Sequence, residues 1–104
     1  MRQIFIDKFI VPANAEQEFT TQMNFNRNFI RSLTEFIKDE AYKRTDAIGN
    51  LIFITVATWE SEEALANARG VVQAEYQQAG FNPMEMLARL NITMEREICQ
   101  PVQI

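Results

Sequence analysis

The acid most suited to chemistry in this chain is Asp7. It is the one carboxylate in the otherwise mostly apolar segment Gln3-Ile4-Phe5-Ile6-Asp7-Lys8-Phe9-Ile10-Val11. A carboxylate removed from water becomes a stronger base, so Asp7 could take a proton from a bound substrate. It could equally be bonded to an arginine or to a polar side chain of a neighbouring strand, as buried carboxylates usually are.

Polar side chains also interrupt the apolar stripes of two predicted helices. Asn26 projects within roughly 20° of Phe19, at the centre of the apolar arc of the first helix. On the second helix Tyr76 lies within the stripe and Arg69 borders it. These groups could bind a ligand carbonyl, a phenolate and an anionic oxygen. They could also be satisfied by protein neighbours or by solvent, since buried polar groups normally find partners.

Composition excludes several classes of site. The chain has no histidine and one cysteine, Cys99. Zinc or haem held by histidine, a Ser-His-Asp nucleophile system and an internal disulfide are therefore excluded. There is no G-x-G-x-x-G segment for a dinucleotide. We expect no cofactor and no metal, and any chemistry must use the remaining polar groups or the substrate itself.

The charge and hydropathy of the chain narrow the range of partners that it could bind. The net charge is −4 and no stripe of lysine and arginine is present, so we expect no nucleic acid partner. The longest nearly apolar run, Leu51–Ala57, is far too short to span a membrane. With no signal-like segment at the start of the sequence, we expect a cytoplasmic protein with no membrane partner.

The order of predicted elements indicates one α+β domain over residues 1–104. Alternation and helical periodicity predict strands over 3–11, 35–45, 51–59 and 91–99, and helices over 14–33, about 62–79 and about 83–89. Ser61 and Asn82 are suited to begin the later helices, and Gly80 to end one. The order β-α-β-β-α-β predicts a ferredoxin-like fold, an antiparallel sheet with its helices on one face.

The opposite face of that sheet is also apolar and must be buried against something other than the helices. The strands over 3–11 and 51–59 are apolar on both faces, while the helices can cover only one. A second copy of the chain is the simplest cover, so we expect a homodimer. Tyr42, Lys38 and Arg96 are candidates for polar contacts across this interface.

Besides the order of elements, one segment of the sequence resembles a known protein family. Ala57-Thr58-Trp59-Glu60-Ser61-Glu62-Glu63-Ala64-Leu65 resembles the strand end and helix start of antibiotic-biosynthesis-monooxygenase-like proteins, which form dimeric α+β barrels. The resemblance covers nearly the whole chain. It implies that Trp59 lines a cavity between sheet and helices, although Trp59 could also be a large core residue. Thr55 shares its strand face and stands where some polyketide-oxidising relatives have asparagine.

The resemblance implies an enzymatic function, and a non-catalytic role is the alternative. Haem-degrading relatives use a histidine that this chain lacks and an asparagine where Asp7 stands, so haem degradation is not expected. A cofactor-independent monooxygenase would act on a small aromatic or quinol-like substrate by deprotonation and electron transfer to oxygen. Asp7 and Trp59 would be catalytic, and the substrate-binding residues would be Asn26, Tyr76, Arg69 and Thr55. The alternative is a non-catalytic dimer that binds a small ligand or serves a stress role.

Overall fold

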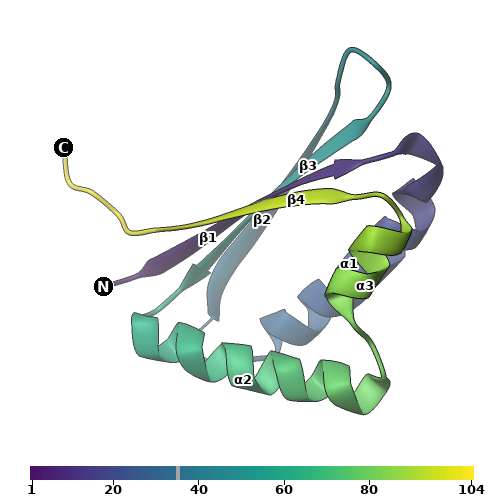
Figure 1. Ribbon diagram of the computed structural model, residues 1–104. Helices are drawn as coiled ribbons and strands as arrows, with labels where there is room; N and C mark the ends of the chain where they lie inside the picture. Colours follow the sequence, from purple (N-terminus) through teal and green to yellow (C-terminus); the bar gives the residue numbers. More distant parts are fainter. Residues whose placement is uncertain (35) are drawn as a thin grey trace.

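The sheet and its helices form two layers in the computed structural model, which describes residues 1–34 and 36–104 (Figure 1). The elements are β1 (Gln3–Val11), η1 (Ala13–Ala15), α1 (Glu16–Arg31), β2 (Phe36–Thr45), β3 (Leu51–Trp59), α2 (Glu62–Ala79), α3 (Pro83–Arg89) and β4 (Thr93–Cys99). The strands are antiparallel in the order β2-β3-β1-β4. The predicted ferredoxin-like fold is confirmed. Glu35, the first residue of the strand predicted over 35–45, lies outside the described residues.

The predicted helix ends at α2 and α3 are confirmed by their hydrogen bonds. The Ser61 hydroxyl accepts the backbone N–H of Ala64 at 3.1 Å, and the Asn82 side chain accepts that of Glu85 at 3.1 Å. Gly80 ends α2 with φ of 69°, a left-handed conformation that glycine adopts without a steric penalty. The turn that links α2 to α3 is therefore set by local sequence.

The starts of two elements differ from the sequence expectation, and the helix expected to end at residue 33 ends at Arg31. The helix expected from residue 14 begins with the short 3-10 turn η1, in which Ala15 N–H donates to the Pro12 carbonyl at 2.9 Å. The strand expected from residue 91 begins at Thr93, because Asn91 has φ of 58° and cannot continue an extended backbone.

Alternation divides β1 between the two faces of the sheet. Phe9 packs against Phe19 of α1 with ring centroids 5.0 Å apart, and Val11 is fully buried in the same core. The odd-numbered residues of β1 therefore face the helices. The even-numbered residues face the other way, where no helix lies (Figure 1).

The core consists of two hydrophobic clusters rather than one. The first surrounds Phe19 and includes Val11, Ala15, Phe53, Leu87 and Ile92. The second surrounds Trp59 and includes Leu65 and Ala68, with Phe5, Ile30, Leu33 and Phe36 packed against it. Phe9 belongs with the first cluster and Phe5 with the second, so the clusters lie toward opposite ends of β1. Position 7 falls between them.

The face without helices is mostly apolar at its centre, where Lys8 is the charged exception. Its half-buried residues include Ile4, Ile6, Ile10, Ile54 and Val56. Acidic side chains flank this centre on β4, and side chains of both charges flank it on β2. We call this surface, from β1 and β3 with its flanking strands, the open face.

Arg96, a candidate for polar contacts between copies, does not belong to the open face. The β1–β4 register puts Arg96 directly opposite Asp7, on the side that carries the helices. None of the described helices is long and apolar enough to cross a membrane.

Candidate functional site

A polar row crosses the middle of the helix-facing side of the sheet. Thr55 of β3 and Arg96 of β4 lie directly opposite Asp7 of β1, one on each side. Residues opposite each other in an antiparallel sheet point to the same face, so all three side chains point toward the helices. The row lies between the two hydrophobic clusters.

Arg96 and Asp7 form the ion pair of this row. The Arg96 Nε donates to one carboxylate oxygen at 2.8 Å and its Nη2 donates to the other at 3.0 Å. The Asp7 side chain is 12% exposed, whereas that of Arg96 is 47% exposed. The carboxylate is therefore covered and held in one orientation, while part of the guanidinium remains open to a ligand.

A second arginine approaches from α2. The Arg69 guanidinium carbon lies 5.1 Å from the centre of the Phe5 ring, and that of Arg96 lies 4.8 Å from the same centre. Among the residues that the structure describes, Arg69 has no ion-pair partner. The ring of Phe5 therefore makes cation–π contacts with two arginines, and we call this ring the Phe5 platform.

Tyr76 brings a hydroxyl to the same region. It lines a recess of about 340 Å³ between α1 and the end of α2, together with Gln22, Phe25, Glu75, Ala79, Gly80 and Phe81. Its ring packs edge-on against Phe81 at 5.2 Å. Burial raises the pKa of Tyr76, and the nearby positive charge of Arg96 partly opposes this increase in pKa. Tyr76 is therefore a neutral hydrogen-bond donor at physiological pH.

Asn26 is half-buried on α1 and bonded within its own helix. Its side-chain oxygen accepts the Gln22 Nε2 at 2.9 Å, and Gln22 in turn lines the recess beside Tyr76. This bond occupies the oxygen of Asn26, so the group it can offer to a ligand is the NH₂.

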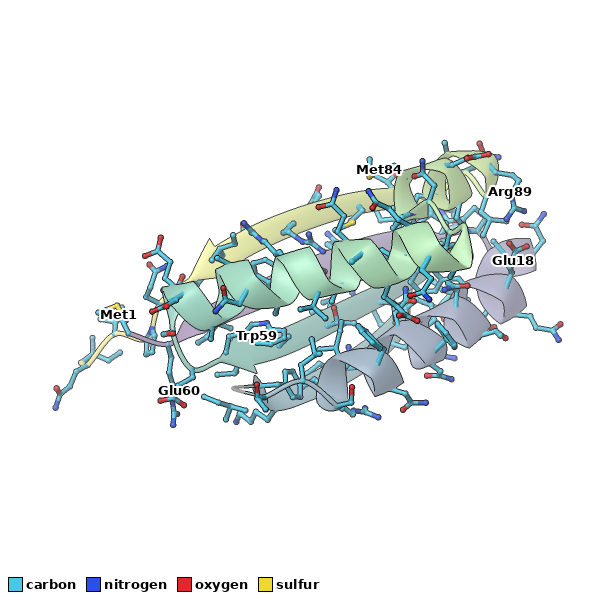
Figure 2. The ribbon with its side chains drawn as sticks, turned by 90° about the horizontal axis from the view of Figure 1, so that it is seen from below. Met1, Glu18, Trp59, Glu60, Met84 and Arg89 are labelled. Carbon is cyan, nitrogen blue, oxygen red and sulfur yellow. The ribbon has the colours of Figure 1, made fainter. Side chains whose placement is uncertain are left out.

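Trp59 lies in the core at the other end of the site. It is 4% exposed and packs against Leu65 and Ala68, with its ring edge-on to Phe36 at 5.2 Å. Figure 2 shows the indole between the sheet and the first half of α2, away from the end of α2 that carries Tyr76. Trp59 belongs to the buried cluster against which Phe5 packs.

The structure brings some of the predicted residues together. Asp7 and Thr55 are neighbours in the row, Arg69 shares the Phe5 platform with Arg96, and Tyr76 is near Arg96. Asn26 and Trp59 lie on either side of this group. Sequence reasoning missed Arg96 as a site residue. Alternation over 93–99 could have found it, because Met94, which packs against the core, shares its face.

An ion pair between α1 and α3 lines a second recess, which adjoins the first and shares Gln22, Gly80 and Phe81 with it. Arg89 of α3 donates to Glu18 of α1, and both line a hollow of about 240 Å³ beside Asn82 and Met86. The two side chains face each other in Figure 2. The hydrogen bond from Arg89 lowers the pKa of Glu18. This salt bridge links α3 to α1. Across the described ranges no three Cys, Asp or Glu residues gather into a metal-binding group.

No protein-family model and no curated protein matches the chain. Solved structures do match it. A variant of SnoaB, a cofactor-independent oxygenase from Streptomyces nogalater, is 17% identical with a TM-score of 0.70, over 99% of this chain and 95% of that one. A Deinococcus radiodurans protein named "putative antibiotic biosynthesis monooxygenase" is 14% identical with a TM-score of 0.70, over 98% and 94%. A dimeric ferredoxin-like protein from an uncultured marine organism is 8% identical with a TM-score of 0.73, over 99% and 97%. The chain therefore shares the ferredoxin-like fold of these solved structures along its whole length.

Proposed function

We propose that this chain is a cofactor-independent monooxygenase that acts on a small aromatic or quinol-like substrate held between the sheet and α1 and α2. The single observation that supports it most is the polar row of Thr55, Asp7 and Arg96 between two hydrophobic clusters. A fold that only needed stability would gain more from apolar residues at these positions, since buried ion pairs add little stability.

The proposed reaction begins with loss of a proton from the substrate. Asp7 is the base, and Arg96 holds its carboxylate in one orientation through two hydrogen bonds. The exposed part of Arg96 and the neutral hydroxyl of Tyr76 stabilise the oxygen anion that forms. Asn26 and Thr55 contact the substrate through an NH₂ and a hydroxyl, while Trp59 backs the apolar wall.

Oxygen then reacts with the substrate anion. For an anthrone-type substrate, one oxygen atom of O₂ becomes a new carbonyl oxygen. The other leaves as water with the two hydrogens of the ring CH₂, and that carbon supplies all the electrons. The protein contributes orientation, a base and hydrogen-bond donors, so the reaction requires no flavin or metal.

We also propose a homodimer, formed through the open face. The isoleucines of β1 and β3 would form its centre, where burial of apolar area is favourable by roughly 25 cal/mol per Å² before association costs. The acidic residues Glu95 and Glu97 on one edge could meet Lys38 and Arg44 on the opposite edge of the partner. A cytoplasmic location suits such a dimer, which has one cysteine per chain and needs no oxidising compartment.

One observation favours the alternative, a ligand-binding dimer without catalysis. Both oxygens of Asp7 already accept hydrogen bonds from Arg96, which leaves this base less free to take a proton. The same groups would then bind a ligand and leave it unchanged.

Oxygen uptake, measured by electrode with anthrones, quinols and dihydroxynaphthalenes, separates the two functions. We expect saturable uptake that falls at least about tenfold in Asp7→Asn and in Tyr76→Phe. Glu60→Gln is the control, because this acid is exposed and follows the end of β3, outside the proposed site. Uptake no faster than the uncatalysed reaction, with these compounds still raising the melting temperature, would favour the ligand-binding protein.

A further inference from the structure

We infer that Arg69 determines specificity for an aromatic ligand that carries a carboxylate or an equivalent anionic group. This inference rests on the proposed function, because it concerns the same site, and it names the class of substrate or ligand. Two observations support it: where the charged groups of the site lie, and which of them already have an ion-pair partner.

The first step is a count of charges around Phe5. The guanidinium carbons of Arg96 and Arg69 both lie within 5.1 Å of its ring centre, and Asp7 is bonded to Arg96. Asp7 uses both of its oxygens on Arg96. One positive charge, that of Arg69, is therefore left without an acid among the described residues.

The second step is the position of Arg69. An exposed arginine on a helix normally extends into water, where its charge is solvated. Arg69 instead lies against Phe5, beside a second guanidinium of the same charge. Arg69 thus adds a second positive charge beside the ring that Arg96 also contacts, and an anion bound near that ring would be attracted by both. Guanidinium groups bind carboxylates through two parallel hydrogen bonds, so this geometry suits a carboxylate.

The third step is the orientation of the ligand. Glu75 lines the recess near the end of α2, where it would repel an anion. The same recess offers the aromatic side chains of Phe25, Tyr76 and Phe81. Arg69 does not line this recess but lies two helical turns before Tyr76 on α2, so the anionic group would lie toward Arg69, outside the recess, and the ring system toward Tyr76 and Phe81.

Binding of two matched compounds tests this inference without reference to oxygen uptake. Isothermal titration calorimetry would compare 3-hydroxy-2-naphthoate with 3-hydroxy-2-naphthamide, which has the same shape without the charge. We expect the wild-type protein to bind the acid about tenfold more tightly. Arg69→Gln should remove this preference by weakening the acid alone, and Arg69→Lys should restore part of it.

Controls separate the local contact from the overall charge. Arg2→Gln, at an exposed position in the N-terminal segment, removes the same charge and should leave both affinities within about twofold of wild type. Circular dichroism and thermal melting would show whether Arg69→Gln remains folded; its exposed position predicts that it does.

Each outcome has a distinct meaning. Equal affinities of the wild-type protein for acid and amide, or equal weakening of both by Arg69→Gln, would overturn the inference even if quinols are oxidised. A preference for the acid that depends on Arg69, without oxygen uptake, would support the inference and overturn the proposed oxygenase. Failure of both compounds to bind would overturn the inference, and oxygen uptake would still decide the proposed function.

Discussion

Arg96 holds Asp7 through two hydrogen bonds of 2.8 and 3.0 Å, although the two residues are 89 positions apart in the sequence. The pair joins the last strand to the first, in the middle of the helix-facing side. In the proposed mechanism this pair also orients the base.

The first prediction concerns the energy of this pair. We expect Arg96→Gln to lower the free energy of unfolding by about 2 kcal/mol, because it leaves the covered carboxylate of Asp7 without its partner. A double-mutant cycle with Asp7→Asn should give a coupling of about 1 kcal/mol, since the Arg96 side chain is half exposed. Urea denaturation at constant protein concentration measures both values. Glu60→Gln, at an exposed position, is the control, and a coupling near zero would contradict the prediction.

The second prediction concerns pH. Burial raises the pKa of Tyr76 above its ordinary value of 10.0, so the folded state favours the neutral phenol. The stability from this group is fully present below pH 10 and is lost as the pH rises through the folded pKa. Absorbance at alkaline pH in Tyr42→Phe follows Tyr76 alone, because the chain has two tyrosines. Ionisation of this tyrosine at its ordinary pKa would contradict the prediction.

The role of Arg96 gives this titration an internal test. Its positive charge lowers the pKa of Tyr76, in opposition to burial. We therefore expect Arg96→Gln to raise the pKa of Tyr76 further when combined with Tyr42→Phe. The pKa of Tyr42 is raised for another reason, its hydrogen bond to Glu40, and should not respond to Arg96.

The third prediction concerns the open face. Ile54→Lys places a second positive charge directly opposite Lys8 at the centre of the proposed interface, so the dissociation constant of the dimer should rise by roughly thirtyfold or more. Val71→Lys makes the same kind of change at an apolar residue of α2 that is 47% exposed, and should leave the dimer intact. Sedimentation velocity across a dilution series measures both variants. An Ile54→Lys dimer as tight as wild type would exclude this face as the interface.

The fourth prediction concerns the first hydrophobic cluster. Phe19 is 2% exposed and its ring lies 5.0 Å from those of both Phe9 and Phe53. Phe19→Ala should lower the free energy of unfolding by roughly 4 kcal/mol through lost burial and the cavity left behind. Phe25→Ala is a matched control on the same helix, because Phe25 is 55% exposed and should cost less than about 1 kcal/mol. Equal costs for the two changes would contradict this account of the core.

Much of the fold could be predicted because local rules act on neighbouring residues. Ser61, Gly80 and Asn82 set the ends of α2 and α3 through bonds that span at most a few positions. The two starts that were misjudged, near Ala15 and Asn91, depend on backbone conformations that a sequence pattern describes poorly. Boundaries of this kind shift by one or two residues at little energetic cost.

By itself, the sequence determined which residues share a face. A strand alternates strictly, so Asp7 had to lie with Phe5 and Phe9, and a chain without histidine could not use imidazole. Only the tertiary structure decided what each residue meets. The register of β4 against β1 brings Arg96 to Asp7 and not to the open face, and packing of α2 buries Trp59 while placing Arg69 over Phe5. Such contacts depend on the balance of packing over the whole chain, where a shift of one residue in register turns every side chain to the other face.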